Sequence, residues 1–240
     1  MTPTLVLVHG TGDTSRGWRK VQAALAHPSV AIDLLGRRER AFDLSRATAE
    51  MTATVAARDV AERCDGPVVL VAHSGGGILA PRIAGALGDR VRHIVFIAAL
   101  VAPEGGLAID VLFPDRREAM AKRRPAVLQK YDNHTFVQRD EDLAFVGDLE
   151  PLRDAVQVQA VESMNMLFRP VSWVGVAPDM PRTFVRPLRD KHHPRDVQQR
   201  LIEACAASEV IDIDSGHTPA RDAPREMARI LDEIASRYPH

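Results

Sequence analysis

A short apolar run that ends on a serine is the part of this sequence best suited to do chemistry. The run Val68–Ala72 reads as a buried strand, and His73-Ser74-Gly75-Gly76-Gly77 follows it directly. A serine on a sharp strand-to-helix turn has its hydroxyl lifted clear of the sheet, which is the geometry of a nucleophile elbow. The usual pattern is G-x-S-x-G, and Ala72 stands at its first glycine. Because alanine is also small, we predict that Ser74 is a nucleophile; the alternative is a Gly/Ser-rich turn that simply ends a strand.

A serine hydroxyl needs a base to take its proton. His217 lies in Asp214-Ser215-Gly216-His217-Thr218-Pro219, just after the last predicted strand and at the same predicted sheet edge as Ser74. Asp190 ends the run that starts at Thr183, and its carboxylate would hold the imidazole in the correct tautomer. The chain order Ser74, Asp190, His217 is the one expected for a triad built on such an elbow.

Other residues compete for these roles. Glu104, after the fourth predicted strand, is the second choice for the acid, and Asp190 could instead be a surface aspartate paired with Arg189 or Lys191. The chain has nine histidines. Position favours His217. The competing histidines lie in polar segments (His27, His134 and His240), beside a strand start (His93) or on a charged loop (His192 and His193).

Acyl transfer builds negative charge on a carbonyl oxygen, which backbone N–H groups can stabilise. Gly75, the residue after the serine, would supply one N–H. The loop Val8–Asp13 follows the first predicted strand, and Thr11 is expected to supply the second, with Gly12 and His73 nearby in the pocket. A phosphate-binding loop is the alternative, but neither Gly-Lys-Ser/Thr nor G-x-G-x-x-G is present.

The elements that must position these residues alternate between two patterns. Apolar strand-like runs joined by helical periodicity argue for a mostly parallel sheet of about six strands with helices on both faces. Met51 and Val55 are placed on the inner face of the second helix. The predicted strands are Thr4–Val8, Val30–Leu35, Val68–Ala72, Val91–Val101, Arg182–Val185 and Val210–Ile213, and the predicted helices are Arg16–Leu25, Ser45–Cys64, Gly76–Leu87, Pro194–Ala206 and Pro224–Ser236.

The alternation stops between residues 105 and 178, where no clean strand appears. We interpret 105–178 as an inserted helical lid after the fourth predicted strand, with 1–104 and 179–240 forming the core. Its apolar residues would line a substrate pocket, or else only seal the lid onto the sheet. The pocket candidates are Met164, Met166, Phe168 and Trp173.

Composition excludes several functional classes. The formal net charge is −1, so no global field favours nucleic acid or an acidic membrane. Two cysteines, Cys64 and Cys205, form neither a disulfide framework nor a metal signature, and Cys205 is assigned to the core. No signal peptide or membrane span is apparent, so we expect a cytoplasmic protein.

With these stretches in place, the chain resembles the α/β-hydrolase superfamily. It is similar to the short, lid-bearing branch that includes plant methylesterases, hydroxynitrile lyases and bacterial salicylate-esterase-like proteins. The resemblance implies the α/β-hydrolase fold, Ser74, Asp190 and His217 as the triad, Thr11 and Gly75 as oxyanion-hole donors, and neither a metal nor an organic cofactor. Asp13 departs from many relatives, and its carboxylate would repel a carboxylate substrate.

The sequence therefore predicts a serine hydrolase that cleaves a small carboxylic ester through an acyl-serine intermediate. The alternatives are a lyase, cyclase or epimerase of the same fold that acts on a secondary metabolite without acylating the serine, and a receptor that has lost catalysis. The expected partner is a small, partly apolar molecule, with no nucleic acid and no membrane. The substrate and the oligomeric state, a homodimer included, stay open.

Overall fold

The computed structural model describes residues 2–37, 47–114 and 169–239. Its centre is one six-stranded sheet in the order β2-β1-β3-β4-β5-β6, in which every neighbouring pair is parallel. The strands are β1 (Thr4–Val8), β2 (Ser29–Ile32), β3 (Val68–His73), β4 (Val91–Ile97), β5 (Arg182–Pro187) and β6 (Glu209–Ile213). The fold predicted from the sequence is confirmed.

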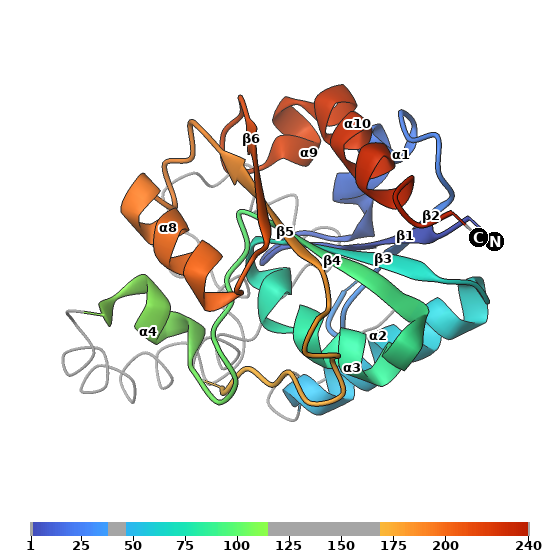
Figure 1. The fold of residues 1–240 in the computed structure, drawn as a ribbon, viewed down its shortest axis with the longest axis horizontal. Helices are drawn as coiled ribbons and strands as arrows, with labels where there is room; N and C mark the ends of the chain where they lie inside the picture. Colours follow the sequence, from blue (N-terminus) through green and yellow to red (C-terminus); the bar gives the residue numbers. More distant parts are fainter. Residues whose placement is uncertain (1, 38–46, 115–168, 240) are drawn as a thin grey trace.

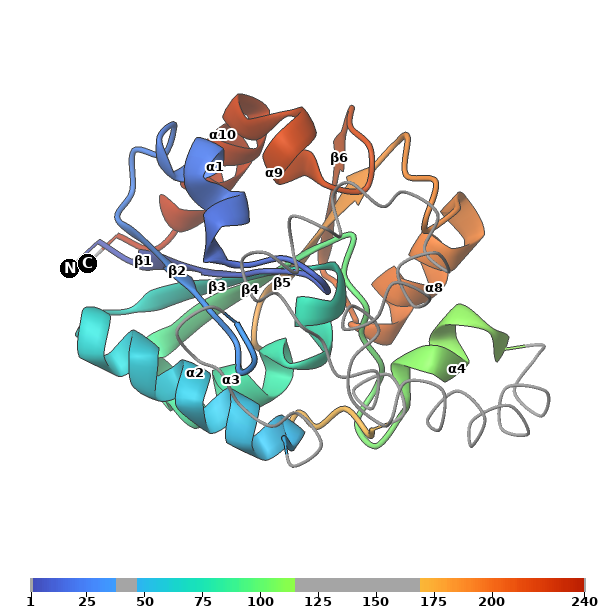
Figure 2. The same ribbon diagram turned by 180° about the vertical axis from the view of Figure 1, so that it is seen from behind.

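Helices cover both faces of this sheet (Figures 1 and 2). One face packs against α2, α3 and α8, and the other against α1 and α10. The helices are α1 (Arg19–Gln22), α2 (Ala49–Arg63), α3 (Ala80–Leu87), α4 (Ala108–Leu112), α8 (Arg195–Ala204), α9 (Pro219–Asp222) and α10 (Pro224–Ala235), with the 3-10 helices η1 (Ser15–Trp18), η2 (Ser74–Ile78) and η3 (Gly88–Arg90). Within the described ranges, no helix is both long and apolar enough to cross a membrane.

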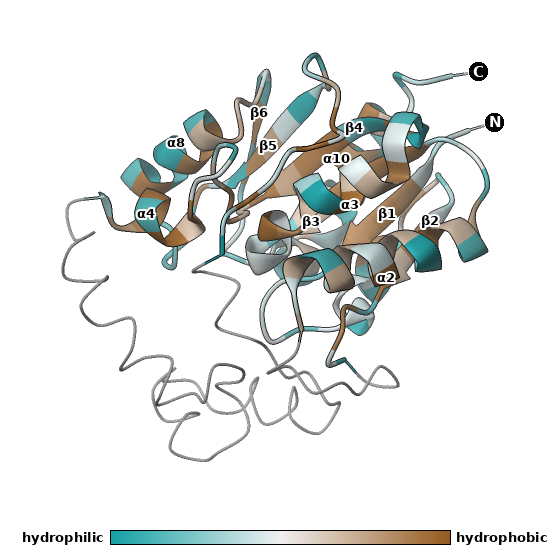
Figure 3. Cartoon of the chain, turned by 90° about the horizontal axis from the view of Figure 1, so that it is seen from below, coloured by the Kyte–Doolittle hydropathy of each residue, from teal (hydrophilic) through white to brown (hydrophobic). Residues whose placement is uncertain are grey.

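The central strands β1 and β3 are almost wholly apolar because both of their faces are buried. Leu5 through Val8 and Val68 through Ala72 are fully inaccessible to solvent, and these strands form the hydrophobic centre in Figure 3. Burying one such side chain stabilises a fold by roughly 1.5–3 kcal/mol. The sheet is therefore a rigid support for the loops at its carboxyl edge.

The structure corrects the expected end of β4 and the expected inner face of α2. The fourth strand ends at Ile97, not Val101, because Ala98 turns the chain with a φ of 45° while its N–H donates to the Val185 carbonyl. Met51 is 40% exposed, so its assignment to the inner face of α2 was wrong. The buried stripe of α2 is instead made of Ala53, Ala56, Ala57 and Val60, which recur at helical spacing.

The two ends of the predicted insertion meet at its base. Leu107 and Pro170 form an antiparallel bridge. Beside it, the Gly105 N–H donates to the Val171 carbonyl at 2.9 Å, and the Val171 N–H donates to the Gly106 carbonyl at 2.8 Å. The chain thus leaves after β4 and returns beside its own exit before β5, the neighbouring strand. Residues 115–168 lie outside the described ranges, so the lid itself stays a prediction.

The His93 ring, buried between β4 and the C-terminus, gives a prediction for acid stability. Its two nitrogens contact the Tyr238 hydroxyl at 2.7 Å and the Thr183 hydroxyl at 2.8 Å. Burial, helped by the charge of Arg237, lowers the pKa of His93 from 6.5 to about 4. Between these two pH values the unfolded chain binds a proton that the folded chain does not, so the free energy of unfolding falls as pH falls.

We expect His93→Gln to make the free energy of unfolding less dependent on pH. Its slope between pH 6.5 and 4 should decrease by at most about 1.4 kcal/mol per pH unit. Urea unfolding at a series of pH values measures the effect. Tyr238→Phe is the control, because it removes a partner of the ring and keeps the titrating imidazole. An identical acid dependence in wild type and His93→Gln would contradict the assignment.

Candidate active site

Ser74 is the first residue of η2 and lies on a strained turn directly after β3. Its φ is 47°, a left-handed conformation that costs a serine free energy, of order 1–3 kcal/mol. The following glycines allow the turn to form. A Cβ on Gly76 would lie 2.5 Å from the His9 carbonyl oxygen, and a Cβ on Gly77 would lie 2.5 Å from that of Leu100. The run after Ala72 is therefore rich in glycine because neighbouring backbone leaves no room for side chains.

Three side chains predicted from the sequence form a continuous hydrogen-bonded series. The Ser74 hydroxyl lies 2.9 Å from Nε2 of His217, and Nδ1 of His217 lies 2.8 Å from Oδ2 of Asp190. With Nδ1 protonated, the ring donates to the carboxylate, and Nε2 is free to accept from the hydroxyl. They come from the loops after β3, β5 and β6, whose carboxyl ends share one edge of the parallel sheet.

Asp190 is held as a buried anion. Its side chain is fully inaccessible, and Oδ1 accepts the backbone N–H groups of His192 at 2.8 Å and His193 at 3.0 Å. Burial by itself raises the pKa of this carboxyl, but the hydrogen bonds from the His217 ring and from these backbone groups outweigh it, and the pKa lies below its usual value. The carboxylate therefore stays charged, and it fixes the orientation of the imidazole.

Three further histidine rings, those of His73, His192 and His193, lie against the ring of His217. His73 donates from Nε2 to the His217 carbonyl at 2.8 Å, and burial together with the nearby His217 lowers the pKa of His73 to about 4. The ring of His193 lies edge-on to that of His217, with centroids 4.8 Å apart. Nδ1 of His193 is buried without a hydrogen-bond partner and lies 4.0 Å from Oδ2 of Asp190. His73 thus positions the backbone of His217, while His193 packs against its ring.

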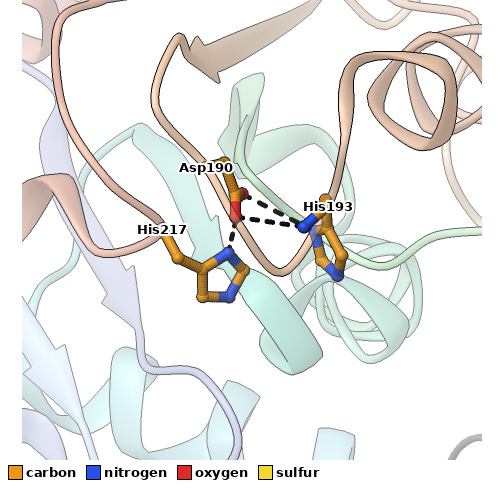
Figure 4. Close-up of side chains that lie close together, drawn as sticks. All are labelled: Asp190, His193 and His217. Atoms are coloured by element: carbon orange, nitrogen blue, oxygen red, sulfur yellow. Dashed lines mark hydrogen bonds and ion pairs between the residues drawn. The ribbon is translucent and has the colours of Figure 1, made fainter.

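Asp190, His193 and His217 also make up the one group among the described residues that could hold a metal ion (Figure 4). One ligand atom from each lies within 4.8 Å of the others. However, Nδ1 of His217 and Oδ2 of Asp190 already share a proton-bearing hydrogen bond. A metal ion on these atoms would displace that proton, so metal binding and the serine–histidine–aspartate arrangement exclude each other.

The two predicted backbone donors are neighbours in space. A Cβ on Gly75 would lie 2.1 Å from the Thr11 hydroxyl oxygen and 3.3 Å from the Thr11 nitrogen. Gly75 belongs to η2, immediately after Ser74, and Thr11 lies in the loop after β1. The structure therefore brings the Gly75 and Thr11 segments together beside Ser74.

A cavity of about 560 Å³ opens in front of Ser74. Its lining includes Ser74, His217, His73, Thr11 and Gly12, all of which the sequence placed at the site. Asp13, which the sequence also led us to expect near the substrate, lines it too, and the remaining lining residues were not predicted: Gly10, Arg16, Gly17, Arg19, Lys20, Thr218, Ala220 and Arg221. Most of them come from the segments around η1, α1 and α9. The sequence signal for α9 was Pro219, because proline is typical of the first turn of a helix.

Two residues that the sequence assigned to the site, Trp173 and Glu104, do not line this cavity. Trp173 is absent from its lining; its indole N–H donates to the Ala102 carbonyl at 3.0 Å, and the Arg182 guanidinium stacks on its ring. Glu104, the second choice for the acid, accepts the Trp173 N–H instead of contacting His217. Both residues join the returning chain to the core. Met164, Met166 and Phe168 lie outside the described residues.

Known proteins resemble the chain over nearly its whole length. It is 26% identical to Methylesterase 7 of Arabidopsis thaliana, covering 97% of this chain and 96% of that protein. It is 27% identical to Lipase LipV of Mycobacterium tuberculosis, covering 95% and 92%. A solved structure, an extracellular alpha/beta-hydrolase from a Paenibacillus species, superposes with a TM-score of 0.77 at 18% identity, covering 96% and 98%.

The family comparison identifies the class. The model of the Alpha/beta hydrolase family matches residues 5–230, a range that includes Ser74, Asp190 and His217. This confirms the family, the fold and the hydrolase class expected from the sequence. The chain belongs to the alpha/beta hydrolase family.

Proposed function

We propose that this protein hydrolyses a small carboxylic ester through an acyl-serine intermediate. The observation that carries the proposal is the series from the Ser74 hydroxyl through the His217 ring to Asp190, with separations of 2.9 and 2.8 Å. A buried anion behind an imidazole that touches a strained serine is the arrangement that activates a hydroxyl for attack. Similarity to a methylesterase and a lipase supports an ester as the substrate.

In the first half of the reaction, the Ser74 oxygen attacks the ester carbonyl while Nε2 of His217 takes its proton. Asp190 stabilises the imidazolium that forms, because its carboxylate accepts from Nδ1. His217 then gives the proton to the leaving alcohol. In the second half, His217 takes a proton from water, the hydroxide attacks the acyl-serine, and the proton returns to the Ser74 oxygen as the acid leaves.

The negative oxygen formed in each half would be held by the N–H groups of Thr11 and Gly75. Each such donor typically contributes about 3 kcal/mol to the stability of the transition state. The closeness of the two segments supports this role, since the position of a Gly75 Cβ falls 3.3 Å from the Thr11 nitrogen. We also propose that 105–178 is the lid over this site, joined at its base by the Leu107–Pro170 bridge.

Intact-protein mass spectrometry after treatment with a fluorophosphonate tests this proposal. We expect one adduct on Ser74 in the wild type and none in a Ser74→Ala variant. A slowly hydrolysed ester should leave the mass of its acyl group on the same residue. Turnover of a substrate with no adduct on Ser74 would instead favour a lyase, cyclase or epimerase in which the serine is never acylated.

A further inference from the structure

Positive charge is concentrated in the cavity in front of Ser74. Four of its lining side chains are cationic, namely Arg16, Arg19, Lys20 and Arg221, and among the described lining residues Asp13 is the one carboxylate. The chain as a whole has a formal net charge of −1. The excess of cations is therefore a property of this cavity and not of the whole protein.

The local fold explains why three of these cations face the cavity. Trp18 is 3% exposed and packs into the core, with its ring edge-on to His73 at a centroid distance of 6.4 Å. This anchor directs the flanking residues of η1 and α1 outward, and Arg16, Arg19 and Lys20 are all exposed. In the described part of the chain, none of their side chains has an ion-pair or hydrogen-bond partner, so their charge is available to a ligand.

The carboxylate of Asp13 is held by the turn that leads into η1. Its Oδ1 accepts the Thr14 N–H at 2.7 Å, and its Oδ2 lies against Gly17, where a Cβ would be only 2.3 Å away. Burial raises the pKa of this carboxyl. Asp13 thus serves the turn into η1, and four cationic side chains line the same cavity as its single carboxylate.

We infer that the substrate carries an anionic group, a carboxylate or a phosphate, which binds to the wall formed by Arg16, Arg19, Lys20 and Arg221 while the ester lies at Ser74. The inference rests on the proposed ester hydrolysis. A cleft lined by one sign of charge concentrates ligands of the opposite sign and speeds their association. Guanidinium groups add charge-assisted, bidentate hydrogen bonds to carboxylate and phosphate oxygens.

Matched esters that differ in one terminal group test this inference. The first series is methyl hexanoate, monomethyl adipate and methyl 5-aminopentanoate, which place a methyl, a carboxylate or an ammonium group after the same four methylene groups of the acyl chain. The second is butyl acetate, 4-acetoxybutanoate and 3-acetoxypropyl phosphate, which place a methyl, a carboxylate or a phosphate on the alcohol side. Comparing 4-acetoxybutanoate with 3-acetoxypropyl phosphate distinguishes recognition of a carboxylate from recognition of a phosphate.

We expect kcat/KM for an anionic ester to exceed that of its neutral partner by on the order of tenfold in at least one series. The ammonium ester should be the poorest of its series. At an ionic strength of about 1 M, where the screening length is about 3 Å, the preference should largely disappear. In an Arg16→Gln, Arg19→Gln, Lys20→Gln triple variant, the ratio of the anionic to the neutral rate should fall towards one.

Arg92→Gln is the matched control, because Arg92 is an exposed arginine at the amino end of β4, the opposite edge of the sheet from Ser74. It should keep the wild-type ratio. A ratio of one or less in both series, or a ratio that survives the triple substitution, would overturn the inference while ester hydrolysis itself stands.

A binding measurement decides the inference without turnover. Calorimetric titration of the Ser74→Ala protein with monomethyl adipate and methyl hexanoate should show tighter binding of the anion, and the triple substitution should remove the difference. If no ester is hydrolysed, the proposed function fails, and this titration still supports or rejects an anion-binding wall. Equal affinities would reject it.

Discussion

Replacing Ser74 by alanine is expected to lower kcat for hydrolysis of a short nitrophenyl ester by about 10⁴-fold or more. The substitution removes the oxygen that lies 2.9 Å from Nε2 of His217 and leaves no other hydroxyl in that place. Alanine keeps the Cβ, so the positive φ of 47° costs the variant about as much as it costs the wild type. The fold should survive while the chemistry is lost.

Initial rates on the nitrophenyl ester, together with a thermal unfolding curve, measure this separation. Ser208→Ala is a suitable control, because the Ser208 hydroxyl contacts the Arg182 carbonyl at 3.1 Å, at the start of β5 and away from the site. It should keep full activity. A Ser74→Ala protein as active as the wild type would remove the acyl-serine mechanism altogether.

Asp190→Asn should have the second largest effect, a fall in kcat of about 10⁴-fold with little change of shape. The amide oxygen can still accept from the backbone N–H groups of His192 and His193. Its NH₂ group, however, would face Nδ1 of His217 and donate where the carboxylate accepted. The ring would then carry its proton on Nε2 and could not take one from Ser74.

The same kinetic assay and a fluorophosphonate labelling rate report this change. Asp214→Asn is the matched control, since Asp214 is exposed and pairs with Arg189 at 2.9 Å instead of with the histidine. We expect it to stay within about twofold of the wild type, as is usual for an exposed ion pair. Labelling of Asp190→Asn at the wild-type rate would show that the carboxylate does not orient His217.

The three residues of the proposed triad could be predicted because the local sequence pattern and the sheet topology both indicate them. An apolar run followed by His73-Ser74-Gly75 marks a strand and a sharp turn, and the loops that carry Asp190 and His217 follow later strands. In a parallel sheet all strand ends with the same direction share one edge, so residues after different strands must converge. The site could thus be assembled from the sequence without knowledge of any side-chain contact.

The surroundings of that centre could not be predicted in the same way. Trp173 looked like a pocket residue from its neighbours in the chain, but Ala102 and Arg182, distant in sequence, hold it elsewhere. Nothing near His193 in the sequence shows that its ring packs on His217. Met51 fits the helical periodicity of α2, but which side of α2 is buried depends on how the helix packs against its neighbours.

The amino-acid sequence by itself determined the parallel sheet, the elbow at Ser74 and the chain order of Ser74, Asp190 and His217, since these follow from hydrophobic periodicity and from turns that only small residues can form. Tertiary structure alone decided the charge of the cavity, because the cations of η1 and α1 and Arg221 of α9 meet there only after Trp18 and α10 are buried on the same face of the sheet. Charges more than two hundred residues apart act together only when packing brings them to one opening.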